Sequence, residues 1–121
     1  MVIRGVRGAI TVKENSSEEI VEKTRILLEK MVQANNIKFH DISAIFFSMT
    51  PDLNAAFPAQ AARHMGMNLV PLMCFQEIPV PDALSKCIRI LLLFNTDKTI
   101  EEINHIYLEG AKILRPDLQP R

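Results

Sequence analysis

The sequence predicts an α+β fold, close to the α/β class, in which one mixed β-sheet carries its helices on a single face. Five stretches have the period-two alternation or the short apolar runs of β-strands, whereas two have helical spacing. Their order along the chain is β-α-β-α-β-β-β, which favours one layered sheet. A chain of 121 residues is sized for a single domain, and we expect that domain to span residues 1–121.

The composition argues against several classes of partner. Fourteen basic residues balance fourteen acidic ones, so the formal net charge is zero and the isoelectric point lies near 6.8. A general binder of nucleic acid or of a membrane surface would need a basic excess, so we expect neither partner. The N-terminus has no apolar signal region, and no apolar run approaches the roughly 20 residues of a transmembrane helix. A cytoplasmic protein is expected.

The cysteines and histidines predict no metal site. Cys74 and Cys87 lack a metal-ligand spacing, and two cysteines are too few for a disulfide scaffold. The histidines at positions 40, 64 and 105 lie far apart and form no i, i+4 pair. We therefore expect neither a metal ion nor another cofactor.

Residues 2–12 form the first predicted strand. Alternation divides its side chains between two faces, with Ile3, Gly5, Arg7 and Ala9 on one and Arg4, Val6, Gly8 and Ile10 on the other. Glycine weakens a strand, so the two glycines indicate a bulge or the close approach of another backbone or a ligand. An edge strand with two solvated arginines is the alternative.

A long helix is predicted over residues 17–35. Ser16 and Glu19 have the spacing of a capping box, in which each side chain satisfies a backbone donor at the start of the helix. The apolar residues then recur on one helical face, which consists of Ile20, Thr24, Leu27 and Met31 with Leu28 beside them. We assign this helix to packing alone.

The next segment predicts a buried strand over residues 41–49, a loop over 50–54 and a short helix over 58–65. Proline suits the first turn of that helix, and Gly66 suits the position after its end. The helix carries Arg63 in its last turn, where an arginine commonly just complements the helix dipole.

Residues 86–94 predict a strand buried in the core, because the run is short and almost wholly apolar. Arg89 lies inside it, and a guanidinium is costly to bury without an anionic partner. Either a carboxylate of this chain pairs with Arg89, or the partner is a ligand. This choice decides most of what the sequence says about function.

The remaining segments complete the sheet. Residues 69–77 contain Pro71, which cannot donate to a strand ladder, so this strand is predicted at an edge or along a subunit boundary. Residues 96–102 predict a turn with a short helical piece, and residues 105–114 a last extended segment. Because one long helix covers only one face of a sheet, several copies packed around a common axis would cover the other, and we expect an oligomer.

No motif for acyl, phosphoryl or hydride transfer is present. What remains is a set of unusual polar residues, namely Arg7, Arg63, Glu77, Arg89 and Tyr107. Arginine suits planar capture of carboxylates, so these residues would hold a small polyanionic metabolite, with Glu77 or Tyr107 binding a hydroxyl. Fixed positive charge and conformational restraint would also accelerate a reaction that needs no proton transfer. Alternatively, Glu77 pairs with Arg89 inside the fold and Tyr107 belongs to the core.

Six blocks in the same order resemble the small, monofunctional AroH-type chorismate mutases over essentially the whole chain. The blocks are residues 3–9 (IRGVRGA), 50–53 with 57–59 (TPDL and FPA), 70–71 with 74–77 (VP and CFQE), 86–89 (KCIR), 107–109 (YLE) and 114–118 (LRPDL). The resemblance implies a homotrimer with a pseudo-α/β-barrel arrangement and an active site at each subunit interface. It also implies the Claisen-type rearrangement of chorismate to prephenate, on the route to phenylalanine and tyrosine.

The resemblance further implies a role for individual residues. Arg89 would donate to the ether oxygen of the breaking bond and to a carboxylate, while Arg7 and Tyr107 would hold the carboxylate of the migrating side chain. Glu77 would accept from the ring hydroxyl, helped by Cys74. The rest of the implied binding site consists of Phe57, Ala59, Met73 and Leu114 as pocket walls, Phe75 and Gln76 beside them, and Arg63 and Arg115 near the mouth.

Two positions depart from the family pattern. Gln60 stands where lysine is expected, and Met73 stands where a smaller threonine is expected. The first removes one long-range attraction for a dianionic substrate, and the second alters a pocket wall. Two other interpretations remain open: a trimeric deaminase of enamines or imines, and a non-catalytic protein that binds a small carboxylate metabolite.

Overall fold

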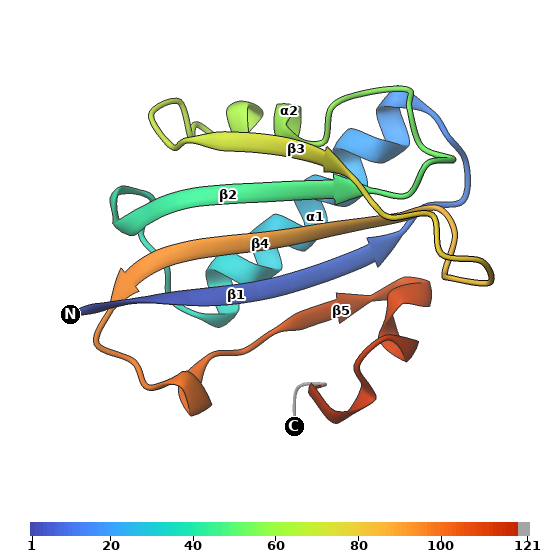
Figure 1. Ribbon diagram of the computed structural model, residues 1–121. Coiled ribbons are helices and arrows are strands. Elements are labelled where there is room, and N and C mark those ends of the chain that lie inside the picture. The colour runs from blue at the N-terminus through green and yellow to red at the C-terminus, as the bar shows by residue number, and fades with distance from the viewer. Residues whose placement is uncertain (119–121) are drawn as a thin grey trace.

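The computed structural model describes residues 1–118 and contains one sheet with two α-helices (Figure 1). Its strands are β1 (Val2–Thr11), β2 (Ile42–Met49), β3 (Leu72–Gln76), β4 (Cys87–Thr96) and β5 (Ile106–Leu108), and its helices are α1 (Ser17–Ala34) and α2 (Ala59–His64). Short 3-10 turns lie at Phe39–Asp41, Ile100–Glu102, Glu109–Ile113 and Pro116–Leu118. No helix in this part of the chain is long and apolar enough to cross a membrane.

The strands lie in the order β3-β2-β4-β1-β5. β4 is antiparallel to both β1 and β2, whereas β2–β3 and β1–β5 are parallel pairs. The predicted mixed sheet is therefore confirmed. β3 lies at an edge, as the proline predicts, and it begins directly after Pro71 instead of at residue 69. β1 lies inside the sheet, so the alternative of an edge strand is wrong.

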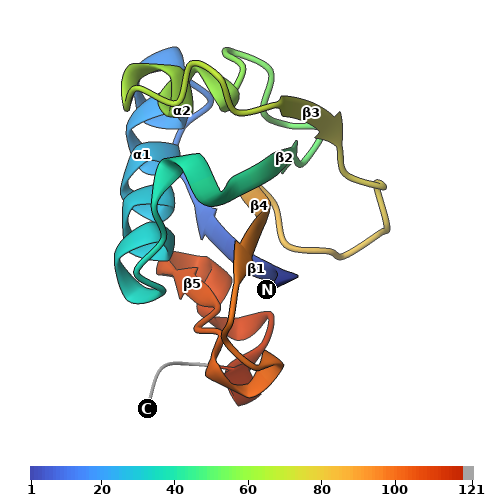
Figure 2. The same ribbon diagram turned by 90° about the vertical axis from the view of Figure 1, so that its left-hand side faces the viewer.

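Both helices cover the same face of the sheet (Figure 2). The buried face of α1, which includes Leu27 and Met31, packs over β1 and β4 into one apolar core. Gly8 lies beneath this helix, where an added Cβ would fall 2.4 Å from the sulfur of Met31. The glycine thus leaves room for the side chains of Met31 and Leu27, rather than for the backbone or ligand that the sequence suggested. β1 has no bulge, because its pairing with β4 is continuous from Val2 to Thr11.

The prediction that residues 86–94 form a strand buried in the core holds for only one face of the strand. Ile88, Ile90 and Leu92 are buried against the helix layer, whereas Arg89 and Leu91 point to the other side and are exposed. We call the sheet face that carries Arg7, Arg89 and Leu91 the open face. A single helix layer covers only one side of a sheet, so several apolar residues on the second side, among them Phe75 and Leu91, remain accessible in the described chain.

Of two local predictions at the ends of helices, one needs correction and the other is confirmed. Ser16 Oγ accepts from the Glu19 N–H at 3.2 Å, but the Glu19 carboxylate binds the N–H groups of Lys13 (2.5 Å) and Glu14 (3.2 Å) instead of that of Ser16. Half of the capping box therefore forms, and Glu19 ties down the preceding loop. Gly66, by contrast, has φ +95°, which confirms its place after the end of α2.

The last predicted strand is mostly not a strand. Only Ile106–Leu108 pairs with β1, and Glu109 then adopts φ 55°, which turns the chain into a 3-10 helix. The Gly110 N–H donates to Thr11 Oγ1 at 2.8 Å and holds this turn against the end of β1. The predicted tail beyond residue 118 lies outside the described residues.

Candidate active site

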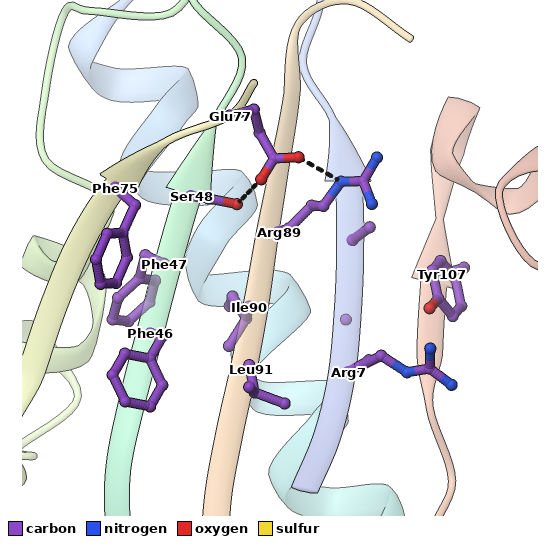
Figure 3. Close-up of a pocket in the computed structure, with 12 residues that line it drawn as sticks. Arg7, Phe46, Phe47, Ser48, Phe75, Glu77, Arg89, Ile90, Leu91 and Tyr107 are labelled. Carbon is purple, nitrogen blue, oxygen red and sulfur yellow. Dashed lines mark hydrogen bonds and ion pairs between the residues drawn. The ribbon is translucent and has the colours of Figure 1, made fainter. Parts of the chain in front are cut away.

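A cavity of about 380 Å³ lies on the open face (Figure 3). Its walls come from all five strands or from the residue that directly follows one. The lining residues are Arg7, Gly8, Ala9, Phe46, Phe47, Ser48, Phe75, Glu77, Arg89, Ile90, Leu91 and Tyr107. The cavity therefore collects Arg7, Glu77, Arg89, Tyr107 and Phe75 from the residues predicted for the binding site.

The pairing register explains why these residues meet. Directly opposed residues share a face of the sheet, so two rows of side chains cross the open face. One row runs from β5 to β3 as Tyr107, Ala9, Arg89, Ser48 and Phe75, and the next consists of Arg7, Leu91, Phe46 and Met73. Each row contains one arginine and at least one aromatic residue. The site is thus built on strands rather than on loops.

Glu77 lies one residue beyond β3, where its N–H donates to the Met49 carbonyl at 2.9 Å. Its Oε1 lies 3.2 Å from Arg89 Nε, and its Oε2 accepts from Ser48 Oγ at 2.5 Å. The Arg89 side chain is 45% exposed and that of Glu77 is 27% exposed. The ion pair that the sequence left open is therefore present, but it lines an accessible cavity instead of lying inside the core.

Glu77 engages the guanidinium at Nε, and the two Nη groups point away from Glu77, toward the β1 and β5 side of the cavity (Figure 3). Cys87 lies two residues before Arg89 on the same strand face and is fully buried. Burial raises the pKa of its thiol, while the nearby Arg89 charge acts in the opposite direction. A neutral thiol beneath the guanidinium leaves the positive charge of Arg89 available to a ligand.

Tyr107 and Arg7 come from neighbouring strands. The Tyr107 side chain is only 6% exposed and packs with Ala9, Cys87 and Ala111, yet it also lines the cavity. Tyr107 therefore belongs to a small core cluster and also lines the cavity. Its place at the floor of the cavity is fixed by the pairing of Ala9 with Tyr107.

His105 is a neighbour of the site that the sequence did not reveal. Its Nδ1 accepts from the Arg7 N–H at 2.9 Å and so ties β1 to the segment that enters β5. Burial lowers the pKa of His105, and the charges of Arg7 and Arg115 lower it further. The imidazole is therefore held neutral, as an acceptor must be.

The other predicted residues lie elsewhere in the single chain. Phe57, Cys74 and Gln76 line a separate hollow of about 320 Å³, which Phe75 shares. Cys74 also packs against the main core, on the helix side of β3, and so does not lie beside Glu77 within one chain. These residues form a second group, on the other side of the edge strand.

A further set lines neither hollow. Ala59, the first residue of α2, is buried, whereas Arg63 and Met73 are exposed on α2 and β3. Leu114 packs against the small cluster around Tyr107, and Arg115 forms an ion pair with Asp117 at 2.9 Å. A single chain thus supplies the arginine-lined cavity but not every predicted wall. Among residues 1–118, no group of three His, Cys, Asp or Glu side chains could hold a metal ion.

Fold and site together define a small α+β enzyme domain whose sheet presents two arginines, a tyrosine and a glutamate to a small-molecule cavity with phenyl walls. Phe46 and Phe75, whose ring centroids lie 6.1 Å apart, form the apolar side. Guanidinium groups select anions, and phenyl rings favour a flat, ring-shaped ligand.

Comparisons with known proteins identify the family. The sequence model described as "Chorismate mutase type I" matches residues 3–118. The chain is 49% identical to "Chorismate mutase AroH" of Thermus thermophilus, over 98% of both chains, and 47% identical to "Chorismate mutase AroH" of Bacillus subtilis (strain 168), over 98% of this chain and 94% of the relative. A solved chorismate mutase from Clostridium thermocellum superposes with a TM-score of 0.90 at 49% identity, covering 91% of this chain and 98% of that one.

The chain belongs to the type I chorismate mutase family, and it is an isomerase of that kind. The family expected from the six sequence blocks and the predicted α+β fold with a mixed sheet are thereby confirmed.

Proposed function

We propose that this chain converts chorismate to prephenate by an intramolecular, Claisen-type rearrangement within the cavity on the open face. The observation that carries the proposal is the position of Arg89, whose Nη groups point across the cavity while Glu77 binds Nε. In such a rearrangement the ether oxygen gains negative charge as its bond to carbon lengthens. A cation that is already fixed in place stabilises this charge more in the transition state than in the ground state.

The other residues would hold the substrate in the reactive conformation. Arg7 and Tyr107 would bind the carboxylate of the migrating side chain from β1 and β5. Glu77, an acceptor when ionised, would bind the ring hydroxyl. The reaction needs no proton transfer and no covalent intermediate, so positioning and fixed charge account for the catalysis.

We further propose a homotrimer that forms a pseudo-α/β-barrel with its active sites between copies. The open face carries large exposed apolar side chains, among them Met73, Phe75 and Leu91, which a partner would cover. Phe57 and Arg63 lie outside the cavity of their own chain. In the trimer, these two residues and the hollow that Cys74 lines would border the cavity of a neighbouring copy.

The proposed setting is the synthesis of phenylalanine and tyrosine in the cytoplasm, without a nucleic-acid or membrane partner. This setting follows from the reaction and stays a prediction.

The experiment is a direct assay of the purified protein. Chorismate is added, and the loss of its ultraviolet absorbance is followed together with the formation of prephenate. We expect saturation kinetics, and we expect Arg4→Ala, an arginine on β1 that binds the Lys98 carbonyl outside the cavity, to behave like the wild type. Binding of chorismate without prephenate formation would instead support a metabolite-binding protein and refute the proposal.

A further inference from the structure

We propose that Ser48 is a positioning residue of this site. It keeps Glu77 in a one-point contact with Arg89 Nε, so that the Nη groups of Arg89 remain directed at the substrate. The inference rests on the proposed function, because it assigns to those Nη groups the stabilisation of the transition state. Ser48 affects the reaction only through Glu77 and Arg89, and it is not itself a catalytic residue.

The sheet fixes Ser48 at the centre of the site. Ser48 is paired with Arg89 on β4 and with Phe75 on β3, so hydrogen-bonded strands flank it on both sides. Its hydroxyl therefore projects from an interior strand beside the guanidinium. Glu77 returns over this position directly after β3 ends (Figure 3).

The carboxylate of Glu77 is divided between two donors. Oε1 lies 3.2 Å from Arg89 Nε, and Oε2 lies 2.5 Å from Ser48 Oγ. A hydroxyl bound to a carboxylate at such a short distance is a strong, charge-assisted hydrogen bond. The shorter contact is therefore made to serine rather than to arginine.

Without that hydroxyl, the same pair would adopt another geometry. Arginine and carboxylate groups frequently form two parallel hydrogen bonds, which here would engage Nε and one Nη together. Such a pair would withdraw one Nη from the cavity and place more of the negative charge of Glu77 against Arg89. Ser48 prevents this rotation because it occupies the second carboxylate oxygen.

The test compares three substitutions on β2 in the chorismate assay. Ser48→Ala should lower kcat by about tenfold, in keeping with the loss of a hydrogen bond to a charged group, and should change KM less. Ser48→Thr retains a hydroxyl and should restore most of the activity. Ser43→Ala, on the same strand but outside the cavity, should stay within about twofold of the wild type. A kcat for Ser48→Ala equal to that of the wild type would overturn the proposal.

Two further measurements separate positioning from a general structural role. In a Glu77→Ala background, Ser48→Ala should change kcat by less than about twofold, because its partner is gone. An undiminished effect of Ser48→Ala in that background would refute the assignment. A crystal structure of Ser48→Ala should have Glu77 turned onto both Nε and Nη of Arg89, and an unchanged Glu77 would also refute it. This structural result does not depend on turnover. It therefore tests the role of Ser48 separately from the proposed function, even if the wild-type protein forms no prephenate.

Discussion

Replacing Arg89 with alanine tests the central claim about this site. The substitution removes the guanidinium but leaves the strand, the buried neighbours Ile88 and Ile90, and the Ser48–Glu77 hydrogen bond in place. We expect Arg89→Ala to fold and to lose nearly all turnover. The loss should appear in kcat far more than in KM, because the charge acts chiefly in the transition state.

The structure indicates how much Arg89→Ala should change the stability of the protein and how much it should change kcat. The Arg89–Glu77 pair is partly exposed, at 45% and 27% for the two side chains, and pairs in such surroundings contribute only about 0–1 kcal/mol to stability. Removal of a single neutral donor to a developing oxyanion costs roughly 3–4 kcal/mol, or about 10²–10³ in rate. A charged donor costs more, so kcat should fall by at least about 10³ while the free energy of unfolding changes little.

The assay follows chorismate absorbance over a range of concentrations, with a thermal melt of each variant at equal protein concentration. Arg4→Ala is the matched control, because it removes a strand arginine that lies outside the cavity. If Arg89→Ala melted like the wild type and kept a kcat within about tenfold of it, the loss would be too small for the proposed role.

Three further predictions follow from packing and charge. Gly8→Ala should lower the free energy of unfolding by about 1–3 kcal/mol, because the new Cβ would meet the Met31 sulfur. Gly5→Ala should cost less, because its Cβ would meet only the Leu91 and Leu93 side chains, at 3.3 and 3.4 Å. Burial lowers the pKa of His105 in the folded state. As the pH drops below about 6.5, the unfolded chain therefore binds a proton at this residue more readily than the folded chain does, and the free energy of unfolding falls. Urea unfolding at pH 7.5 and pH 5 should record this fall, which His105→Gln should reduce. Gln60→Lys should raise kcat/KM at low salt by steering a dianionic substrate, and the gain should fade as the ionic strength rises.

Each of these expectations has a contrary outcome. Equal stabilities of the two glycine variants would mean that α1 moves away at no cost. A pH dependence that persists unchanged in His105→Gln would assign the effect to other groups. A gain in Gln60→Lys that is independent of salt would indicate a direct contact rather than long-range attraction.

The order of elements and the faces of the strands could be predicted from the sequence because they depend on local patterns. Period-two alternation placed Arg7 and Ala9 on the same face of β1, and both border the cavity. Pro71 placed β3 at an edge, since a residue without an N–H cannot donate on both sides of a ladder. The same alternation in β2 puts Phe46 and Ser48 on one face, and both line the cavity.

Long-range partners could not be predicted in the same way. The His105–Arg7 hydrogen bond joins residues 98 positions apart, and it depends on the parallel pairing of β5 with β1. The last strand ends early because Glu109 adopts a left-handed backbone conformation. Glycine and asparagine are the usual residues for that conformation, so a glutamate there gives no sequence signal of a turn. The apolar run 86–94 predicts a strand buried in the core, but apolar content alone does not distinguish a core strand from one with an accessible apolar face.

The Glu77–Arg89 ion pair bears on the catalytic assignment through charge as well as geometry. The cavity of one chain carries two guanidinium groups and one carboxylate, so its residues leave a single positive charge facing a substrate with two carboxylates. A closed site with that balance would bury an uncompensated negative charge, which is costly. Further cations at the mouth would restore the balance, and Arg63, exposed on α2 and outside the cavity of its own chain, could supply one to a neighbouring copy in the proposed trimer. The pair that partly neutralises Arg89 within one chain is thus a physical argument for the proposed site between chains.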